Sequence, residues 1–111
     1  MSDTVAGYLV TTALTAVDLQ ASPPAPQRVN STITLTATPT GGANVEYWFE
    51  VSYVDATGVR QHVTLRPYGP SRTCLWMPTE ARSYTVTVYA REVGSTGRYS
   101  VMKSIGYSIS R

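Results

Sequence analysis

Apolar and polar residues alternate along most of this chain, which is the pattern of half-buried β-strands. The clearest run is Thr32–Thr38, where Ile33, Leu35 and Ala37 share one face and threonines share the other. The same period of two predicts a strand over Val45–Val54. No segment keeps a 3.6-residue period over three helical turns, so the sequence predicts an all-β fold.

The interior is expected to form around one tryptophan and one tyrosine. Cys74 and Trp76 share a face of a strand predicted for 71–77, and a short corner joins this strand to another over 83–92. Tyr84 opens the second strand, and alternate residues after it are apolar. The predicted structural core consists of Tyr47, Phe49, Trp76, Tyr84, Val86 and Val88.

Residues that favour turns divide the chain into short strands. The proline-rich segments 22–26 and 67–70 are expected to end strands, because proline lacks the N–H that a central strand donates. In the strand before the second of them, Val63 and Leu65 share the apolar face. The last strand changes phase, and a β-bulge near Lys103 would restore its alternation. The seven predicted strands are 13–20, 32–38, 45–54, 59–65, 71–77, 83–92 and 99–109.

Seven short strands separated by turns predict a β-sandwich of the immunoglobulin or fibronectin III kind. Tyr84 fits the tyrosine corner of such folds, in which a tyrosine at the start of the sixth strand hydrogen-bonds to the backbone upstream. Cys74 is the only cysteine, so no internal disulfide can form and core packing must hold the sheets together. We expect its thiol to be buried like a small apolar group.

Three segments resemble bacterial modules known as the two component regulator three Y domain. The resemblance covers about residues 14–109, although Arg82 stands where the family prefers glycine and Cys74 is unusual. It implies an immunoglobulin-type sandwich without catalytic residues, located in the periplasm or outside the cell. The segments are Thr32 to Ala37, Gly41-Gly42 to Phe49, and Tyr68 through Trp76-Met77-Pro78-Thr79 to Val88.

From this resemblance we expect a non-catalytic module, 13–111, of an exported bacterial protein. It would act as a spacer or connector, or as part of the extracytoplasmic region of a two-component sensor, with neighbouring domains of the same protein as partners. Residues 1–12 are expected to form a leader. Because Ala6–Val10 matches Ile105–Ile109 in its glycine and tyrosine, the leader is either the tail strand of a preceding tandem copy or a chance match.

Composition narrows the classes of partner. Charged residues make up 14% of the chain, against about 25% in typical soluble domains. The net charge is +2 and the arginines are scattered, so we expect no nucleic-acid binding. No apolar run approaches the ~18 residues of a membrane helix, so we expect no membrane insertion. A single domain suggests a monomer.

Catalytic chemistry has little support in the sequence. The only histidine, His62, lies on the polar face of its strand, and we expect it to be exposed and distant from Cys74. Glu46 and Glu50 lie four residues apart on one strand, or about 13 Å, beyond the ~5–9.5 Å of paired glycosidase carboxylates. No calcium-loop, phosphate-loop or dinucleotide motif is present, so we expect no catalytic residues, metal site or cofactor.

One surface is a candidate for binding. The outward faces of 45–54 and 83–92 carry aromatic and charged side chains, and these two strands are neighbours in an immunoglobulin-type sheet. Such a patch would stack on sugars, which makes a polysaccharide-binding module the alternative function. The competing interpretation is that Trp48 and Tyr89 form a cross-strand pair that only stabilises the sheet. The candidate binding face comprises Trp48, Glu50, Thr87, Tyr89 and Arg91.

Overall fold

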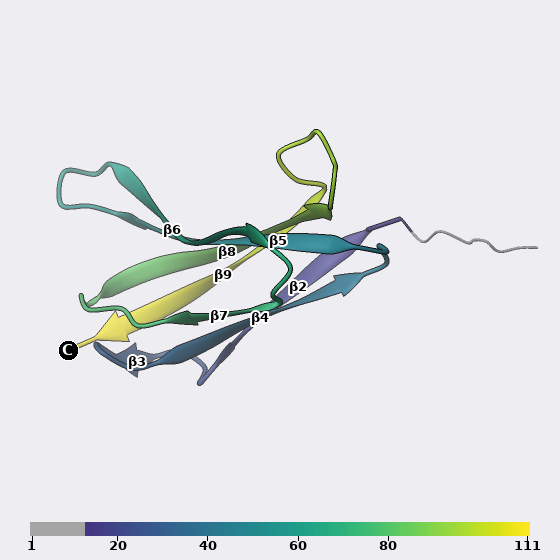
Figure 1. Ribbon diagram of the computed structural model, residues 1–111. Helices are drawn as coiled ribbons and strands as arrows, with labels where there is room; N and C mark the ends of the chain where they lie inside the picture. Colours follow the sequence, from purple (N-terminus) through teal and green to yellow (C-terminus); the bar gives the residue numbers. More distant parts are fainter. Residues whose placement is uncertain (1–12) are drawn as a thin grey trace, which may run out of the picture.

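The computed structural model describes residues 13–111, which form eight β-strands and, within this range, no helix (Figure 1). The prediction of an all-β fold is therefore confirmed. The expectations for residues 1–12 concern a segment outside the described residues. The strands are β2 (Ala16–Ser22), β3 (Gln27–Arg28), β4 (Ile33–Thr40), β5 (Val45–Val54), β6 (Arg60–Gly69), β7 (Thr73–Trp76), β8 (Arg82–Glu92) and β9 (Val101–Ser110).

The strands form two sheets that pack face to face (Figure 1). One sheet has the order β2-β4-β7 and the other the order β3-β9-β8-β5-β6. The number of strands differs from the predicted seven because of β3, a two-residue strand that runs parallel to β9. Its residues, Gln27 and Arg28, follow the proline-rich segment, where no alternation marks a strand.

The core lies between the two sheets and follows the alternation of the sequence. In β5, Tyr47, Phe49 and Val51 point inward and are at most 3% exposed. In β8, alternate residues from Tyr84 to Ala90 also point inward and are at most 8% exposed. The six residues predicted for the core are all buried, and so is Cys74. Burial of this kind contributes about 25 cal/mol per Å² of apolar surface and stands in place of a disulfide.

The corner before β8 is built from three aromatic residues. The Tyr84 hydroxyl donates a hydrogen bond to the backbone oxygen of Glu80 at 2.9 Å, which confirms the predicted tyrosine corner. Trp76 meets Tyr84 edge-on at 5.0 Å between ring centroids and Tyr107 at 5.5 Å. The Tyr107 hydroxyl donates to the backbone oxygen of Pro23 at 2.6 Å. The corner is thus joined to both the proline-rich segment and the last strand.

Strand β6 corrects the prediction that residues 67–70 end a strand. It continues through Pro67 to Gly69, because it is the edge of its sheet and an edge residue needs no N–H on its free side. Val63, expected on an apolar face, is 43% exposed. The reason is that β7, the edge strand of the opposite sheet, has only four residues and leaves much of β6 uncovered.

Strand β9 corrects the predicted bulge near Lys103. Its register with β8 is unbroken from Val101, which pairs with Ala90, to Ile109, which pairs with Arg82. Lys103 therefore shares the face of Ile105 but lies exposed. The phase change in the sequence reflects the end of the core rather than a break in the ladder.

The two ends of the module lie at opposite poles (Figure 1). Near the start of β2, Leu14 lies beside Gly42, which belongs to the turn before β5. The Glu92 carboxylate at the end of β8 accepts hydrogen bonds from the backbone N–H groups of Ala43 (3.2 Å) and Asn44 (3.1 Å), and Gly42 has a φ of 82°. The last strand ends at the other pole, beside the start of β8.

Candidate functional site

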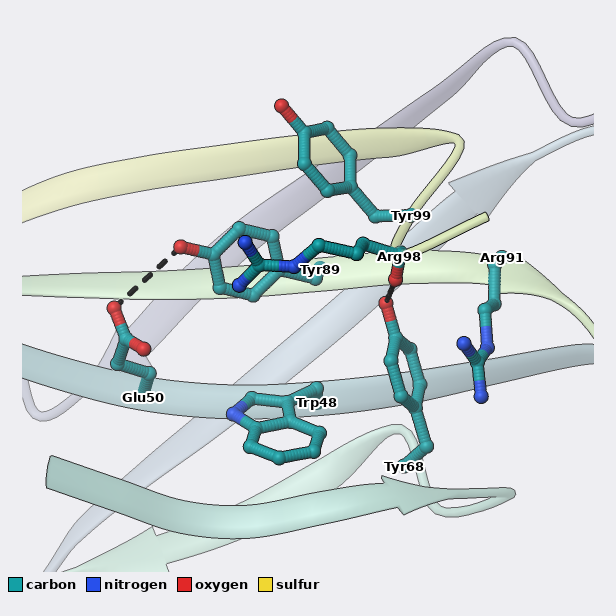
Figure 2. Close-up of a pocket in the computed structure, with 7 residues that line it drawn as sticks. All are labelled: Trp48, Glu50, Tyr68, Tyr89, Arg91, Arg98 and Tyr99. Carbon is teal, nitrogen blue, oxygen red and sulfur yellow. Dashed lines mark hydrogen bonds between the residues drawn. The ribbon is translucent and has the colours of Figure 1, made fainter. Parts of the chain in front are cut away.

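A hollow of about 310 Å³ opens on the outer face of the five-stranded sheet (Figure 2). Four aromatic rings, two guanidinium groups and one carboxylate surround it. This size is at the lower end of the range for small-molecule sites. We call it the aromatic hollow, and its lining residues are Trp48, Glu50, Tyr68, Tyr89, Arg91, Arg98 and Tyr99.

The floor of the hollow consists of side chains that point outward from β5 and β8, because successive residues of a strand point to opposite faces of the sheet. Because Phe49 points into the core, Trp48 and Glu50 on either side of it point outward from β5. Tyr89 and Arg91 point outward from β8 for the same reason. The ladder sets Trp48 directly opposite Tyr89.

An irregularity in the β5–β6 pairing places Tyr68. Between the pairs Tyr47–Gly69 and Phe49–Arg66, one residue of β5 faces two residues of β6. The extra residue is the signature of a β-bulge, which re-aims side chains. The Tyr68 ring consequently meets the Trp48 ring edge-on, with 5.5 Å between centroids.

Arg91 and Tyr68 form one wall. The Arg91 Nε lies 2.6 Å from the Glu46 carboxylate, and its Nη1 donates to the backbone oxygen of Gly97 at 3.0 Å. The guanidinium carbon sits 3.8 Å from the centre of the Tyr68 ring, within the range of cation–π contacts. The Tyr68 hydroxyl donates to the backbone oxygen of Arg98. These contacts tie the β8–β9 loop to the sheet.

Glu50 and Tyr89 form the opposite side. The Tyr89 hydroxyl donates to the Glu50 carboxylate across 3.5 Å, and the same oxygen lies 3.0 Å from Nδ1 of His62 (Figure 2 shows the tyrosine contact). Burial, and then the charge of Glu50, raise the pKa of Tyr89. Burial also raises the pKa of Tyr68. Both phenols therefore remain protonated at neutral pH and act as hydrogen-bond donors.

Three groups remain available at the mouth. Within residues 13–111, neither the Trp48 indole N–H nor the Arg98 guanidinium has a hydrogen-bond partner. Figure 2 shows the Arg98 side chain extending from the loop toward Tyr89. Tyr99 is 46% exposed, and its ring is tilted against that of Tyr89 at 5.2 Å. The mouth thus offers flat apolar faces beside unpaired donors.

The structure brings together four of the five residues of the predicted binding face. Trp48, Glu50, Tyr89 and Arg91 all line the aromatic hollow. Thr87 does not, because it is 4% exposed and its hydroxyl bonds to that of Ser104 at 2.8 Å.

Sequence reasoning missed Tyr68, Arg98 and Tyr99. Tyr68 lies between two prolines in a segment predicted to be a turn, and Arg98 belongs to a loop. The alternation predicts that Tyr99 begins the last strand, but β9 begins only at Val101 and Tyr99 belongs to the same loop. The run of an arginine and a tyrosine after Gly97 is the one signal that could have pointed to them.

Trp48 and Tyr89 agree only in part with the interpretation that they form a cross-strand pair that stabilises the sheet. The two residues are directly opposite in the ladder, yet each ring packs against a different neighbour, Trp48 on Tyr68 and Tyr89 on Tyr99. A simple stacked cross-strand pair would leave no space between the rings. The observed arrangement instead leaves the hollow between two aromatic pairs.

Of the two remaining reactive side chains, His62 contacts one residue of the hollow and Cys74 contacts none. The His62 side chain is 57% exposed, as predicted, and its contact is Glu50. Cys74 is buried on the other sheet, and burial raises the pKa of its thiol. Among residues 13–111, no three His, Cys, Asp or Glu side chains are grouped closely enough to hold a metal ion.

Two comparisons with known proteins found no relative of this chain. No protein-family model matches the chain, and no curated protein matches it. Nor does the described part of the chain contain a helix long and apolar enough to cross a membrane. Membership of the three Y domain family, suggested by the sequence segments above, stays a prediction.

Proposed function

We propose that this chain is a non-catalytic module of the immunoglobulin or fibronectin III kind that connects domains of an exported bacterial protein. The strand order supports the assignment. With β2, β4, β5, β7, β8 and β9 taken as strands A, B, C, E, F and G, strands A, B and E share one sheet and C, F and G the other, as in immunoglobulin folds. The tyrosine corner of Tyr84 supports it further.

The observation that most supports the connecting role is that the first and last strands place the two ends of the module at opposite poles. Leu14 lies at the pole where β8 ends, and Ile109 pairs with Arg82 at the pole where β8 begins. The 11 residues of β8 span about 33 Å at ~3.3 Å per residue. A chain that enters at one pole and leaves at the other sets its neighbours apart by the length of the module.

Small-angle X-ray scattering on one, two and three tandem copies tests this role. Each added copy should lengthen the maximum dimension by about 30 Å or more, since the poles are that far apart. A three-copy protein whose maximum dimension equals that of two copies would contradict the proposal. A variant with a long glycine–serine linker between copies is the control for flexible, unstacked arrays.

The exported setting, including a place in the extracytoplasmic part of a two-component sensor, rests on the resemblance of the segments around Trp76 and Tyr84 to three Y modules. Fractionation of the source cells, followed by detection with an antibody raised against residues 13–111, tests it. Signal in the periplasmic or extracellular fraction is the expected result. Signal confined to the cytoplasm would contradict it.

A further inference from the structure

We propose that the aromatic hollow binds an acidic saccharide, with a sugar ring on its aromatic faces and the sugar carboxylate at Arg98. This goes beyond the connecting role, which depends on the poles of the sandwich and not on its outer face.

The shape of the lining favours a flat, amphipathic ring. The Trp48–Tyr68 pair and the Tyr89–Tyr99 pair stand on two sides of the hollow, each with its rings inclined to one another. Inclined pairs expose ring faces as well as edges, and an aromatic face packs well against the C–H face of a pyranose by dispersion. The volume of about 310 Å³ suits a ligand segment rather than a folded partner.

The polar groups favour a hydroxylated ligand over a purely apolar one. The Trp48 N–H and the Arg98 guanidinium are donors without partners among the described residues, and the Glu50 carboxylate is an acceptor. An apolar ligand would bury these groups without replacing their bonds to water, at a cost in affinity. Sugar hydroxyls, which both donate and accept, would satisfy them.

The charge balance favours a carboxylate on that sugar. Arg91 is already paired with Glu46 at 2.6 Å, while Glu50 accepts from the Tyr89 hydroxyl at 3.5 Å and lies 3.0 Å from Nδ1 of His62, which forms an ion pair with it only when protonated. Arg98 is the charged side chain of the lining that has neither a hydrogen-bond nor an ion-pair partner in residues 13–111. A guanidinium binds a carboxylate through two parallel hydrogen bonds, which makes Arg98 the anion-recognising residue. A cationic ligand would be repelled by the same group.

Heteronuclear NMR titration with oligogalacturonate tests this proposal. The protein contains two indole N–H groups, and only Trp48 faces the hollow, while Trp76 is buried in the core. The Trp48 indole peak should move with added oligosaccharide and the Trp76 peak should not. The methyl ester of the same oligosaccharide, which lacks the charge, should bind about tenfold more weakly or worse. Added salt should weaken binding of the acid form.

Two exposed side chains allow tests that leave the fold intact. Arg98→Gln should weaken binding of the acid form by about tenfold and bring it close to that of the ester. Tyr99→Ala should weaken both forms about equally, since it removes a stacking face. Arg72→Gln, which removes the same charge from an exposed position outside the hollow, is the matched control and should bind like the natural protein.

Several results would overturn the proposal. One is an unmoved Trp48 peak in the presence of oligogalacturonate. Another is equal binding of the acid and its ester, which would indicate a neutral saccharide site. A third is equal binding by the Arg98→Gln and Arg72→Gln variants. A shift of Trp48 produced by a proline-rich peptide but by neither oligosaccharide would likewise replace the saccharide with a peptide ligand.

Discussion

The molecule contains two aromatic groups built from similar parts, one between the sheets and one outside them. In each, a tryptophan meets tyrosine edge-on and an arginine lies over a tyrosine ring: half-buried Arg82 over Tyr53 at 4.0 Å at the rim of the inner group, and Arg91 over Tyr68 at 3.8 Å in the outer one. We call Trp76, Tyr84, Tyr107 and Tyr53 the inner aromatic cluster.

The two groups differ in what their polar atoms do. In the inner aromatic cluster, the hydroxyls of Tyr84 and Tyr107 donate to backbone oxygens at 2.9 and 2.6 Å. In the aromatic hollow, the Tyr89 hydroxyl makes a long contact of 3.5 Å, and the indole N–H of Trp48 has no partner within residues 13–111. The same side chains thus hold a fold together where they are enclosed, and are available to a ligand where they are not.

Replacing each tryptophan by alanine should separate the two groups most clearly. Trp76→Ala removes the centre of a closed core and should lower the free energy of unfolding by about 3–5 kcal/mol. Trp48→Ala removes a half-buried ring and should cost about 1–2 kcal/mol. Urea denaturation followed by circular dichroism measures both values. Equal losses would mean that the hollow is as structural as the core.

The two arginines offer a second, smaller contrast. Arg91→Met leaves the Glu46 carboxylate, whose side chain is 17% exposed, without its partner and should destabilise the protein by about 1–3 kcal/mol. Arg82→Met should cost less than about 1 kcal/mol, because its partner Glu80 is 63% exposed. The double variant Arg91→Met/Glu46→Gln should recover part of the loss. No recovery would show that packing on Tyr68, and not the ion pair, holds Arg91.

Single hydroxyls give a finer comparison. Tyr84→Phe removes the hydrogen bond of the tyrosine corner and should cost about 1 kcal/mol. Tyr89→Phe removes only the long contact with Glu50 and should change stability by less than about 0.5 kcal/mol. Denaturation midpoints for the two variants, measured side by side, decide the order. A larger loss of stability in Tyr89→Phe than in Tyr84→Phe would show that the Glu50–Tyr89 contact stabilises the fold.

The smallest expected effect lies at the β5–β6 hairpin, outside both aromatic groups. Hydrogen bonds from the side chains of Thr57 and Gln61, and then from the backbone of Val59, lower the pKa of Asp55 from its ordinary value of 3.8. The ionised Asp55 carboxylate therefore stabilises the folded state. This stabilisation is complete above pH 3.8 and is lost as the pH falls through the lower pKa of Asp55 in the folded state.

Carboxyl NMR titration should give Asp55 a midpoint below 3.8 in the natural protein. A midpoint closer to 3.8 is expected in Thr57→Ala, which lacks the 2.6 Å hydroxyl bond. Thr96→Ala, in the loop between β8 and β9, is the control and should leave the Asp55 titration unchanged. A midpoint in the Thr57 variant equal to that of the natural protein would assign the lowered pKa to the Gln61 side chain and the backbone donors instead.

Alternation predicted the inner face far better than the outer one. Burial imposes a period of two, so residues such as Phe49, Val86 and Val88 could be assigned to the core without coordinates. The same alternation correctly predicted that Trp48 and Tyr89 lie on the outer face. It also pointed to Thr87, which is buried, because a polar residue can satisfy itself against a neighbouring strand.

What the sequence could not supply depends on strand pairing. Tyr68 reaches Trp48 through a register shift between β5 and β6, and register is a property of two strands at once. Arg98 belongs to a loop with no period to follow, and Tyr99 lies in that loop because β9 begins two residues later than the alternation predicts. Strand β3, only two residues long, exists because β9 lies beside it.

The short parallel pairing of β3 with β9 would have a mechanical consequence in the connecting role proposed above. Gln27 and Arg28 lie alongside Ile109 and Ser110, and the N–H of Val29 donates to the oxygen of Ser110 at 2.8 Å. Tension between the neighbours would pull these strands past each other along their length, so the bonds would share the load. Separating β3 from β9 under such tension would require these bonds to rupture together rather than one at a time.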